Sequence, residues 1–542
     1  MSSIPNAPEP RNEKVLDYAP GSRERQELKA GIGKLRGEQA EIPVVVGGRE
    51  IRTGELRKSI MPHNHTVPLA TWHKAGTAEV LQAVQAAKEA SREWASWRWE
   101  DRVAVFLRAA DLLANSWRPI LNAATMLGQS KTAHQAEIDS ACELIDFWRY
   151  NAHFAQRIFA EQPRSAPGTW NRFDHRPLEG FVYAVTPFNF TAIAGNLPTA
   201  PAMLGNVVIW KPSDKAVFSG YHILKLLEAA GLPPGVISFI PGTASEITET
   251  LLSSPDLAGI HYTGSTSVFE RIWGEVSDRI DGYRSYPRLV GETGGKDFIL
   301  AHPSADPVAV SVAIVRGGFE YQGQKCSAAS RIFIPDSLWP EIRDRTLEMI
   351  AEIRVGDPED FRNFMGAVID RSSFDNIVSY IEDARQSDEA EILAGGTYDD
   401  GEGFFIDPTL IKVSNPSHRL MREEIFGPVV TVYVYPDREW EEVLHLIDRS
   451  TPYGLTGGVF ATSRAAILQA GEVLRNTAGN FYINDKPTGA VVGEQPFGGA
   501  RKSGTNDKAG SILNLQRWIS PRVIKETFHP PTSYRYPFMD DA

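Results

Sequence analysis

The chain has 542 residues, of which 42% are hydrophobic and 23% charged, the balance of a soluble globular protein with more than one domain. A net charge of −12 and a pI of about 5.6 argue against a nucleic-acid-binding surface. The two cysteines cannot build a disulfide framework, which favours a reducing compartment, and no apolar run approaches the length of a membrane span.

The N-terminal stretch, residues 1–40, is polar and punctuated by proline, and we expect a surface arm there. Residues 1–30 lack the apolar segment of a secretory signal, and their acidic residues argue against an organellar transit peptide. The sequence therefore predicts a cytoplasmic protein, with a processed mitochondrial matrix form as the alternative.

The first structured region begins with a short strand at 42–46 and a turn at Gly47-Gly48. Apolar residues at helical spacing then predict helices at 77–94, 100–115 and 133–159. Cys142 falls in an apolar stripe of the third helix, so we expect it in the core.

A stretch rich in Pro, Gly and Ser, residues 163–177, separates these helices from a regular alternation. Strands are predicted at 181–185, 207–210, 236–240 and 259–262, with helices at 192–204, 216–230 and 246–253. This alternation indicates βαβ units and a parallel sheet with right-handed crossovers. The dinucleotide fingerprint Gly-x-Gly-x-x-Gly is absent.

The second half repeats the alternation. Helices are predicted at 305–315 and 338–353, and strands at 331–334, 429–435, 457–462 and 479–483. Residues 519–527 are typical of an edge strand, which invites pairing with another chain.

Cys326 is the candidate nucleophile. It lies in Gly323-Gln324-Lys325-Cys326-Ser327, where small residues leave the sulfur approachable and Lys325 would favour a thiolate. Taken alone, the pattern also fits a simple buried thiol. Glu292, in a Gly-rich turn after an apolar run, supplies the carboxylate base that a covalent thiol mechanism requires.

Four motifs occur together along the chain: Glu292-Thr293-Gly294-Gly295-Lys296, Gly323-Gln324-Lys325-Cys326, Glu424-Ile425-Phe426-Gly427-Pro428, and Pro496-Phe497-Gly498-Gly499. The cysteine of the second motif follows Glu292 by 34 residues. With these motifs, the chain resembles the aldehyde dehydrogenase superfamily over residues 15–530. The runs 136–139, 187–193, 323–327, 482–486 and 496–508 resemble its branch that oxidises L-glutamate γ-semialdehyde.

This resemblance implies an aldehyde dehydrogenase-like α/β fold with three parts. A Rossmann-type NAD-binding domain would comprise residues 1–162 and 181–290, and an α/β catalytic domain residues 291–505. A β oligomerisation flap would comprise residues 163–180 and 506–542, giving a homo-oligomer that is a dimer or an assembly of dimers. The superfamily also lacks the Gly-x-Gly-x-x-Gly fingerprint, so its absence is compatible with NAD.

The expected cofactor site lies at strand ends. Lys211, Ser213 and Asp214 follow a buried strand, where open α/β sheets bind ligands. Thr263, Gly264 and Ser265 end the next strand on this edge, with Ser265 as an N-cap whose free N–H groups suit a pyrophosphate. The full set expected to bind the cofactor is Lys211, Ser213, Asp214, Gly242, Thr243, Thr263, Gly264, Ser265, Glu424 and Phe426.

Within this set, the resemblance assigns Lys211 to a ribose and Glu424 to the nicotinamide ribose. From the residues alone, Lys211 also fits a solvated strand end and Glu424 a solvated helix end. A carboxylate at Asp214 would repel a 2′-phosphate, which favours NAD over NADP. No metal site is predicted.

The mechanism implied by the resemblance begins with attack of Cys326 on the aldehyde carbon. The Asn189 side chain and the Cys326 N–H would meet the oxyanion, although Asn189 also fits an ordinary turn. Hydride passes to the nicotinamide, and Glu292 activates the water that hydrolyses the thioester.

For the substrate, the resemblance implies that Gly489 and Ala490, with the Ser327 hydroxyl, hold the α-carboxylate. Some relatives have Ser where this chain has Ala490, which leaves the affinity open. Two aromatic walls and a carboxylate at the mouth complete the expected pocket: Phe190, Phe497 and Glu143. Glu143 fits a solvated helix residue equally well.

Three other functions stay open from the sequence. The first is oxidation of another carboxylated aldehyde, such as succinate semialdehyde, with NAD or NADP. The second is a thiol esterase without a cofactor. The third is a non-catalytic binding protein that has kept the fold.

Overall fold

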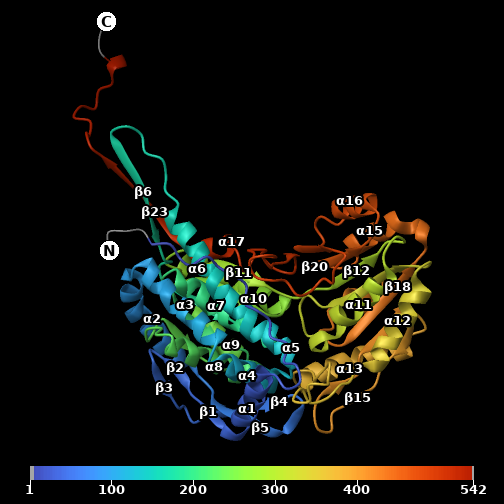
Figure 1. Cartoon of the computed structure of the whole chain (residues 1–542). Coiled ribbons are helices and arrows are strands. Elements are labelled where there is room, and N and C mark those ends of the chain that lie inside the picture. The colour runs from blue at the N-terminus through green and yellow to red at the C-terminus, as the bar shows by residue number, and fades with distance from the viewer. Residues whose placement is uncertain (1–4, 540–542) are drawn as a thin grey trace.

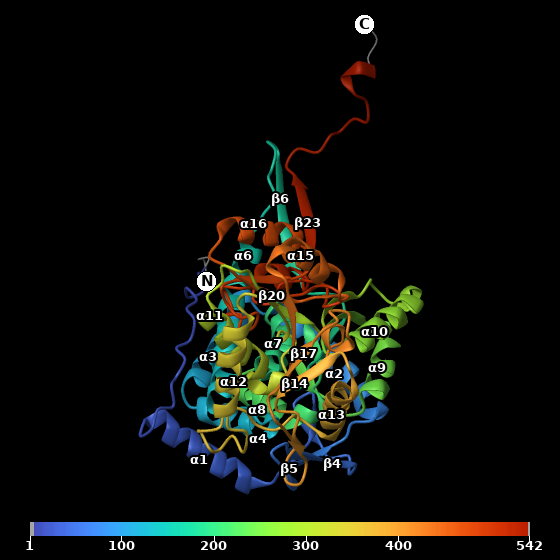
Figure 2. The same cartoon turned by 90° about the vertical axis from the view of Figure 1, so that its right-hand side faces the viewer.

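The computed structural model describes residues 5–539 and contains two bodies, each built around a seven-stranded sheet, with a two-stranded ribbon projecting from them (Figures 1 and 2). The first sheet has the order β11-β10-β7-β8-β9-β2-β3. The five strands from β11 to β9 are parallel and mostly buried, which explains their apolar sequences, whereas β2 and β3 are antiparallel. The strands are β2 Val44–Val46, β3 Arg49–Ile51, β7 Phe181–Val185, β8 Val207–Lys211, β9 Ile237–Phe239, β10 Leu257–Thr263 and β11 Arg288–Glu292.

Every strand and helix predicted between residues 77 and 115 and between 181 and 262 is confirmed, with ends that shift by a few residues. The helices of this body are α2 Thr77–Ser96, α3 Trp99–Ala114, α7 Thr191–Met203, α8 Val217–Ala229, α9 Ala244–Leu252 and α10 Thr266–Asp278. The chain places β8 and β9 on one side of β7 and then returns to place β10 and β11 on the other. The carboxyl ends of β7 and β10 therefore flank the crevice where open α/β sheets bind ligands.

The second sheet has the order β14-β17-β18-β13-β12-β20-β21 and is parallel except for the edge pair β14 and β17. The predicted strands at 331–334, 429–435, 457–462 and 479–483 are confirmed within it, as are the predicted helices at 305–315 and 338–353. Its strands are β12 Asp297–Ala301, β13 Ala329–Pro335, β14 Ala390–Ala394, β17 Thr409–Val413, β18 Val429–Tyr435, β20 Thr456–Phe460 and β21 Asn480–Ile483. Its helices are α11 Pro307–Phe319, α12 Trp339–Glu352, α13 Arg371–Gln386, α14 Arg419–Arg422, α15 Trp440–Arg449 and α16 Arg464–Val473.

Smaller elements complete the fold. A three-stranded sheet, β1-β5-β4, lies below the first body, and two short strand pairs, β15 with β16 and β19 with β22, border the second. Their bounds are β1 Ala40–Ile42, β4 Leu56–Met61, β5 Asn64–His73, β15 Tyr398–Asp399, β16 Phe405–Ile406, β19 Tyr453–Gly454 and β22 Ala500–Arg501, with α17 Ile512–Gln516 near the C-terminus. No helix in the described part of the chain is both long enough and apolar enough to cross a membrane.

The prediction of a surface arm is wrong for residues 23–38, which form α1 Arg23–Glu38. Leu28, Ile32 and Leu35 form a narrow apolar stripe that is buried, and α1 packs on α4 Arg118–Gln129, a helix that was also not predicted. Charged residues dominate α1, so the stripe is hard to see in the sequence. The part of this prediction that concerns residues 1–4 lies outside the described residues.

The predicted helix at 133–159 is continuous but changes its winding. It runs through α5 Ala133–Ala136, the π-helical turn η1 Glu137–Glu143 and α6 Leu144–Ala160. A π-helical turn inside an α-helix is rare and frequently marks a functional site. Propensity patterns do not reveal it, because the residues on either side remain helical.

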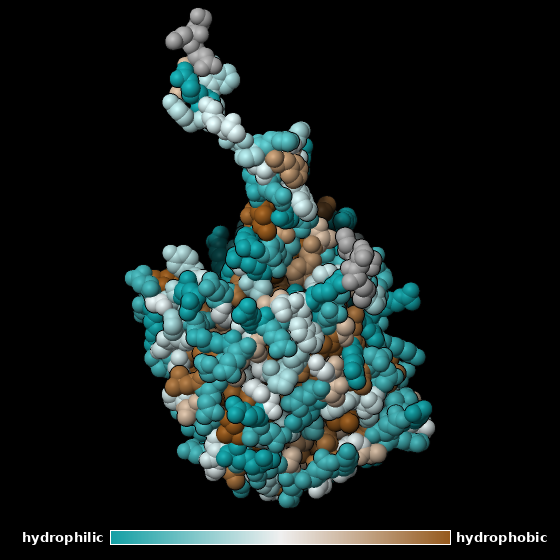
Figure 3. Space-filling model, turned by 90° about the vertical axis from the view of Figure 1, so that its left-hand side faces the viewer, coloured by the Kyte–Doolittle hydropathy of each residue, from teal (hydrophilic) through white to brown (hydrophobic). Residues whose placement is uncertain are grey.

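The predicted edge strand at 519–527 is confirmed as β23 Ser520–Thr527, which pairs antiparallel with β6 Thr169–Arg176. The two strands form the projecting ribbon (Figure 1), and hydrophobic residues gather in places on its surface (Figure 3). The side chains of Trp170 and Val523 on these strands are exposed. A two-stranded ribbon has little stability of its own, so packing against another surface would stabilise it.

The buried stripe of α1 gives a first prediction. Leu28→Ala should reduce the free energy of unfolding by about 2–5 kcal/mol, because it leaves a cavity against α4. Leu81→Ala on α2, where the side chain is 56% exposed, is the control and should change stability little. Thermal and urea unfolding of both variants measure the effect. Equal stability of the two variants would show that α1 is not part of the core.

Candidate active site

The candidate catalytic residues lie where the carboxyl ends of the strands in the first sheet approach the amino ends of the strands in the second. Glu292 ends β11 at the carboxyl edge of the first sheet, and residues 293–296 lead directly to β12 of the second. Cys326 lies just before β13, at the amino edge of the second sheet. The buried Asn189, which follows β7, donates from Nδ2 to the Gln324 carbonyl at 3.1 Å and so joins the two edges beside the cysteine.

The loop before Cys326 has an unusual backbone. Tyr321, Gln322 and Gly323 have φ angles of 54°, 54° and 65°, in the left-handed region. This conformation costs about 1–3 kcal/mol for each non-glycine residue and persists only where its surroundings enforce it. At Gly323 a side chain is excluded as well, because a Cβ would lie 2.2 Å from the Gly427 carbonyl oxygen.

Two buried glutamine side chains hold this strained loop. Gln322 donates from Nε2 to the carbonyl oxygens of Ser130 (3.1 Å) and Ala367 (2.8 Å). Gln324 accepts from the Ile369 N–H through Oε1 at 2.9 Å. The loop that presents Cys326 is therefore fixed to neighbouring segments on two sides.

The sulfur of Cys326 lies in an environment that disfavours a thiolate. Burial raises its pKa well above the ordinary value, and the carboxylates of Glu292, Asp297 and Glu424 raise it further. The prediction that Lys325 favours the thiolate is not borne out, because its Nζ pairs with Glu320 Oε2 at 3.1 Å. Cys326 is therefore a neutral thiol at rest.

The Glu292 side chain is half-buried and holds its proton more tightly than an ordinary carboxyl group. Burial raises the pKa of Glu292 to about 8, and its Oε1 is buried without a hydrogen-bond partner among the described residues. It lines a small cavity with Glu143 and Phe497, and both of these residues also line the larger cavity at Cys326. A carboxyl group so placed can take a proton from a water molecule that approaches Cys326.

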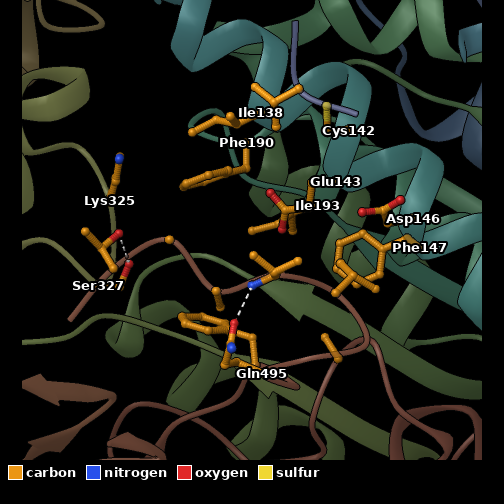
Figure 4. Close-up of a pocket in the computed structure, with 18 of the residues that line it drawn as sticks. Ile138, Cys142, Glu143, Asp146, Phe147, Phe190, Ile193, Lys325, Ser327 and Gln495 are labelled. Atoms are coloured by element: carbon orange, nitrogen blue, oxygen red, sulfur yellow. Dashed lines mark hydrogen bonds between the residues drawn. The ribbon is translucent and has the colours of Figure 1, made fainter. Parts of the chain in front are cut away.

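All the residues predicted to bind substrate line one cavity of about 290 Å³ together with Cys326. They are Ser327, Gly489, Ala490, Phe190, Phe497 and Glu143. Ser327 Oγ donates to Thr488 Oγ1 at 2.9 Å, which ties the loop at 488–492 to the residue after the cysteine (Figure 4).

Glu143 extends from η1 into this cavity (Figure 4). Burial raises its pKa well above the ordinary value, so the interpretation as a solvated helix residue is wrong. Cys142 is buried as predicted, but its surroundings are polar: its sulfur lies 3.6 Å from Arg118 Nη2 and from Glu137 Oε1.

Most of the predicted cofactor residues share the carboxyl edge of the first sheet. Lys211 ends β8 and is buried, with its Nζ 2.8 Å from Asp214 Oδ1, so it is not a solvated strand end. Ser265 is the N-cap residue of α10, but its side chain makes no capping bond, which leaves the first N–H groups of the helix for a ligand. The other residues at these strand ends are Ser213 before η2 Asp214–Ala216, Gly242 and Thr243 before α9, Thr263 at the end of β10 and Gly264 directly after it.

Glu424 and Phe426 approach from the second sheet. Glu424 Oε1 accepts a hydrogen bond from the Gly295 N–H at 3.0 Å, and burial raises the pKa of the Glu424 carboxyl to about 7. The interpretation of Glu424 as a solvated residue at a helix end is therefore wrong. Gly294 allows this approach, since a Cβ there would lie 2.1 Å from Glu424 Oε2. Phe426 has a φ of 58° and packs edge-on against Phe188, with 5.8 Å between the ring centroids.

A buried ion pair that was not predicted supports the site from behind. Lys131 Nζ lies 2.6 Å from Asp139 Oδ2 and over the rings of Phe190 and Tyr321, 4.2 and 4.4 Å from their centroids. Asp139 also accepts the first two N–H groups of α7, at 2.9 and 2.8 Å. The pair thus connects a wall of the cavity to the strained loop. The run at 136–139 was noted in the sequence, but nothing in it identifies Lys131 as the partner.

One group of residues in the described chain has the composition of a metal site. His63, Asp357 and Glu359 offer ligand atoms within 4.8 Å of one another. Arg36 Nη2 already lies 2.8 Å from Glu359 and 3.7 Å from Asp357, so a cation balances these carboxylates. The absence of a metal site stays a prediction.

Comparison with known proteins agrees with this geometry. A sequence profile described as the aldehyde dehydrogenase family matches residues 51–524. The chain belongs to the aldehyde dehydrogenase family. The resemblance and the fold predicted from the sequence are therefore confirmed.

Similar members of this family have related names. The mitochondrial delta-1-pyrroline-5-carboxylate dehydrogenase of Dictyostelium discoideum is 51% identical over 539 residues, covering 99% of this chain and 97% of the relative. The human protein of the same name is 48% identical over 529 residues, 97% of this chain and 94% of its own. The crystal structure of the Mycobacterium tuberculosis delta-pyrroline-5-carboxylate dehydrogenase bound with NAD is 52% identical, covers both chains completely and has a TM-score of 0.97.

The electrostatics of the thiol can be tested by alkylation. In a Cys142→Ala background, the rate of iodoacetamide reaction at Cys326 should be low at neutral pH and rise with pH, because its pKa is raised. Glu292→Gln should accelerate the reaction about threefold or more above pH 8, where Glu292 is ionised and repels the thiolate, and have little effect below it. Unchanged or slower alkylation of the variant at pH 9 would contradict this coupling.

Proposed function

We propose that this protein catalyses the NAD-dependent oxidation of L-glutamate γ-semialdehyde, formed from 1-pyrroline-5-carboxylate, to L-glutamate, the second step of proline degradation. The observation that carries the proposal is the shared cavity. It combines Cys326, aromatic walls at Phe190 and Phe497, and the loop of Gly489 and Ala490, whose N–H groups have no hydrogen-bond partner among the described residues. About 50% identity over nearly the whole chain to proteins named delta-1-pyrroline-5-carboxylate dehydrogenase supports the same substrate.

The first step is attack of the Cys326 sulfur on the aldehyde carbon. The resulting oxyanion would accept from Asn189 Nδ2 and from the Cys326 N–H. Asn189 is already directed at this loop through its bond to the Gln324 carbonyl. Because the thiol is neutral at rest, its proton must leave before or during attack.

The donor set on the facing edges fits a dinucleotide. We assign Lys211, Ser213 and Asp214 to a ribose, Gly242, Thr243, Thr263, Gly264 and Ser265 to the pyrophosphate rim, and Glu424 and Phe426 to the nicotinamide half. The free N–H groups at the start of α10 suit a phosphate, and the carboxylates of Asp214 and Glu424 suit ribose hydroxyls. When bound, NAD accepts a hydride from the substrate carbon.

Glu292 then serves the hydrolysis of the thioester on Cys326. Its buried carboxyl, with an unpartnered Oε1 and a pKa of about 8, can take a proton from the attacking water. The cavity that it lines adjoins the substrate cavity through Glu143 and Phe497, so water can reach the thioester from this side.

The α-carboxylate of the substrate would lie in the loop of Gly489 and Ala490, opposite Ser327. The Ser327 hydroxyl donates to Thr488 here and can turn toward a bound carboxylate. Ala490 contributes its N–H group and no hydroxyl. Glu143 lies farther out and suits the substrate ammonium.

The assembly and cellular location follow from different features. The ribbon of β6 and β23, with its exposed hydrophobic side chains, supports a homo-oligomer of at least two chains. It also supports the predicted division of the chain into three parts: residues 1–162 with 181–290, residues 291–505, and residues 163–180 with 506–542. Residues 1–4 and 540–542 lie outside the described part of the chain. For the location we keep the cytoplasm, with the mitochondrial matrix as the alternative because several relatives are named as mitochondrial.

The function is tested by following NADH formation. The purified protein should have a higher kcat/KM for L-glutamate γ-semialdehyde than for succinate semialdehyde, and a higher activity with NAD than with NADP. Cys326→Ala should abolish NADH formation yet keep NAD binding, whereas Cys142→Ala, the other cysteine, should remain active. A preference for succinate semialdehyde would replace the proposed substrate, and turnover by Cys326→Ala would refute the nucleophile.

A further inference from the structure

The N-terminal segment contributes to the wall of the cavity that contains Cys326. Asn12, Glu13 and Val15 line this cavity together with the residues predicted to bind substrate. The family profile begins at residue 51, so this wall lies outside the part of the chain that the profile matches. This wall was not predicted, because residues 1–40 were expected to form a surface arm.

Asn12 joins three elements around the cavity. Its Nδ2 donates to Asp146 Oδ2 at the start of α6 and to the Val492 carbonyl, both at 2.8 Å. Its Oδ1 accepts from the Tyr150 hydroxyl at 2.8 Å. The side chain therefore fixes the end of the loop that begins at Thr488.

This loop is held at both ends by residues of the cavity. Ser327 contacts Thr488 at 2.9 Å, and Asn12 contacts Val492 at 2.8 Å. Between these contacts lie Gly489 and Ala490, whose N–H groups are the proposed carboxylate site. Gly489 has a φ of 92°, a conformation that favours glycine, and without a Cβ it restricts the backbone least.

The N-terminal segment is itself firmly anchored. The Glu13 N–H donates to Asp146 Oδ1 at 2.7 Å, and the Glu13 carboxylate pairs with Arg118 and Arg149 at 2.8 and 2.7 Å. A few residues further, the Leu16 N–H donates to Glu137 Oε1 at 2.9 Å. Asn12 is thus held by a buried polar network and not by a single surface contact.

We infer that Asn12 is a positioning residue that determines specificity for carboxylated aldehydes. It fixes Val492, and through it the loop that carries the N–H groups of Gly489 and Ala490 in the cavity of Cys326. The inference rests on the proposed function. An aldehyde without a carboxylate does not use this loop, and its oxidation does not depend on Asn12.

The test compares two substrates in two variants. Asn12→Ala should raise the KM for L-glutamate γ-semialdehyde about five- to tenfold, as expected for losing hydrogen bonds that hold the binding loop, with kcat nearly unchanged. Its kcat and KM for propanal should stay within about twofold of the parent. Asn6→Ala is the matched control, because Asn6 lies on the same segment, outside the cavity, and contacts only Gln156 through Oδ1 at 2.7 Å among the bonds described.

A second variant keeps the inference testable if Asn12→Ala does not fold. Tyr150→Phe removes one hydrogen bond to the Asn12 amide and should raise the same KM by a smaller factor, again without an effect on propanal. An unchanged KM in Asn12→Ala, an equal loss with both aldehydes, or the same loss in Asn6→Ala would overturn the inference. A parent enzyme inactive with L-glutamate γ-semialdehyde would instead refute the proposed function.

Discussion

Burial of a thiol and a carboxyl group between the edges of two sheets is the constraint on which the rest of the site depends. Cys326 lies just before the amino end of a strand in one sheet, and Glu292 lies at the carboxyl end of a strand in the other. Burial disfavours the charged form of both groups, and the Glu292 carboxylate further disfavours the Cys326 thiolate. Both groups are therefore mainly uncharged at neutral pH, and Glu292 acts as a base through its ionised form.

Such a site requires rigid support, because a neutral thiol gains reactivity only when the reacting atoms are well placed. The backbone at Tyr321 and Gln322 stores strain, and the bonds of Gln322 and Gln324 to neighbouring segments maintain it. Lys131 supports the same loop from the other side, between the rings of Phe190 and Tyr321. Nucleophile and substrate wall are thus positioned by one buried network.

Much of the fold could be predicted because its signals are local. Apolar runs such as 181–185 and 429–435, bounded by turn residues, gave the strands of both sheets with nearly correct ends. Helix α1 was missed because its three buried apolar residues are dispersed among charges. The strand β12 was missed because it follows a Gly-rich motif so closely that the motif dominated its interpretation.

The site was predicted in part, because a motif identifies reactive side chains but not the residues that contact them. Residues with a reactive side chain in a motif, such as Glu292 and Cys326, were identified, and the cavity brings the predicted substrate residues together. The partners that control them are set by the fold. Glu320 lies near Lys325 in sequence and pairs with it, whereas Asn12 bonds to the distant Val492 and Lys131 lies over the ring of Tyr321. A motif shows which groups are present, whereas only the fold shows which of them are paired.

The central claim is that Cys326 forms the covalent intermediate and Glu292 serves its hydrolysis. It is tested most directly by mass spectrometry of Glu292→Gln after mixing with NAD and L-glutamate γ-semialdehyde. The account predicts that a glutamyl thioester accumulates on the peptide that contains Cys326 while NADH forms in a single turnover. NADH formation without any acyl group on Cys326, or an acyl group on another residue, would contradict it.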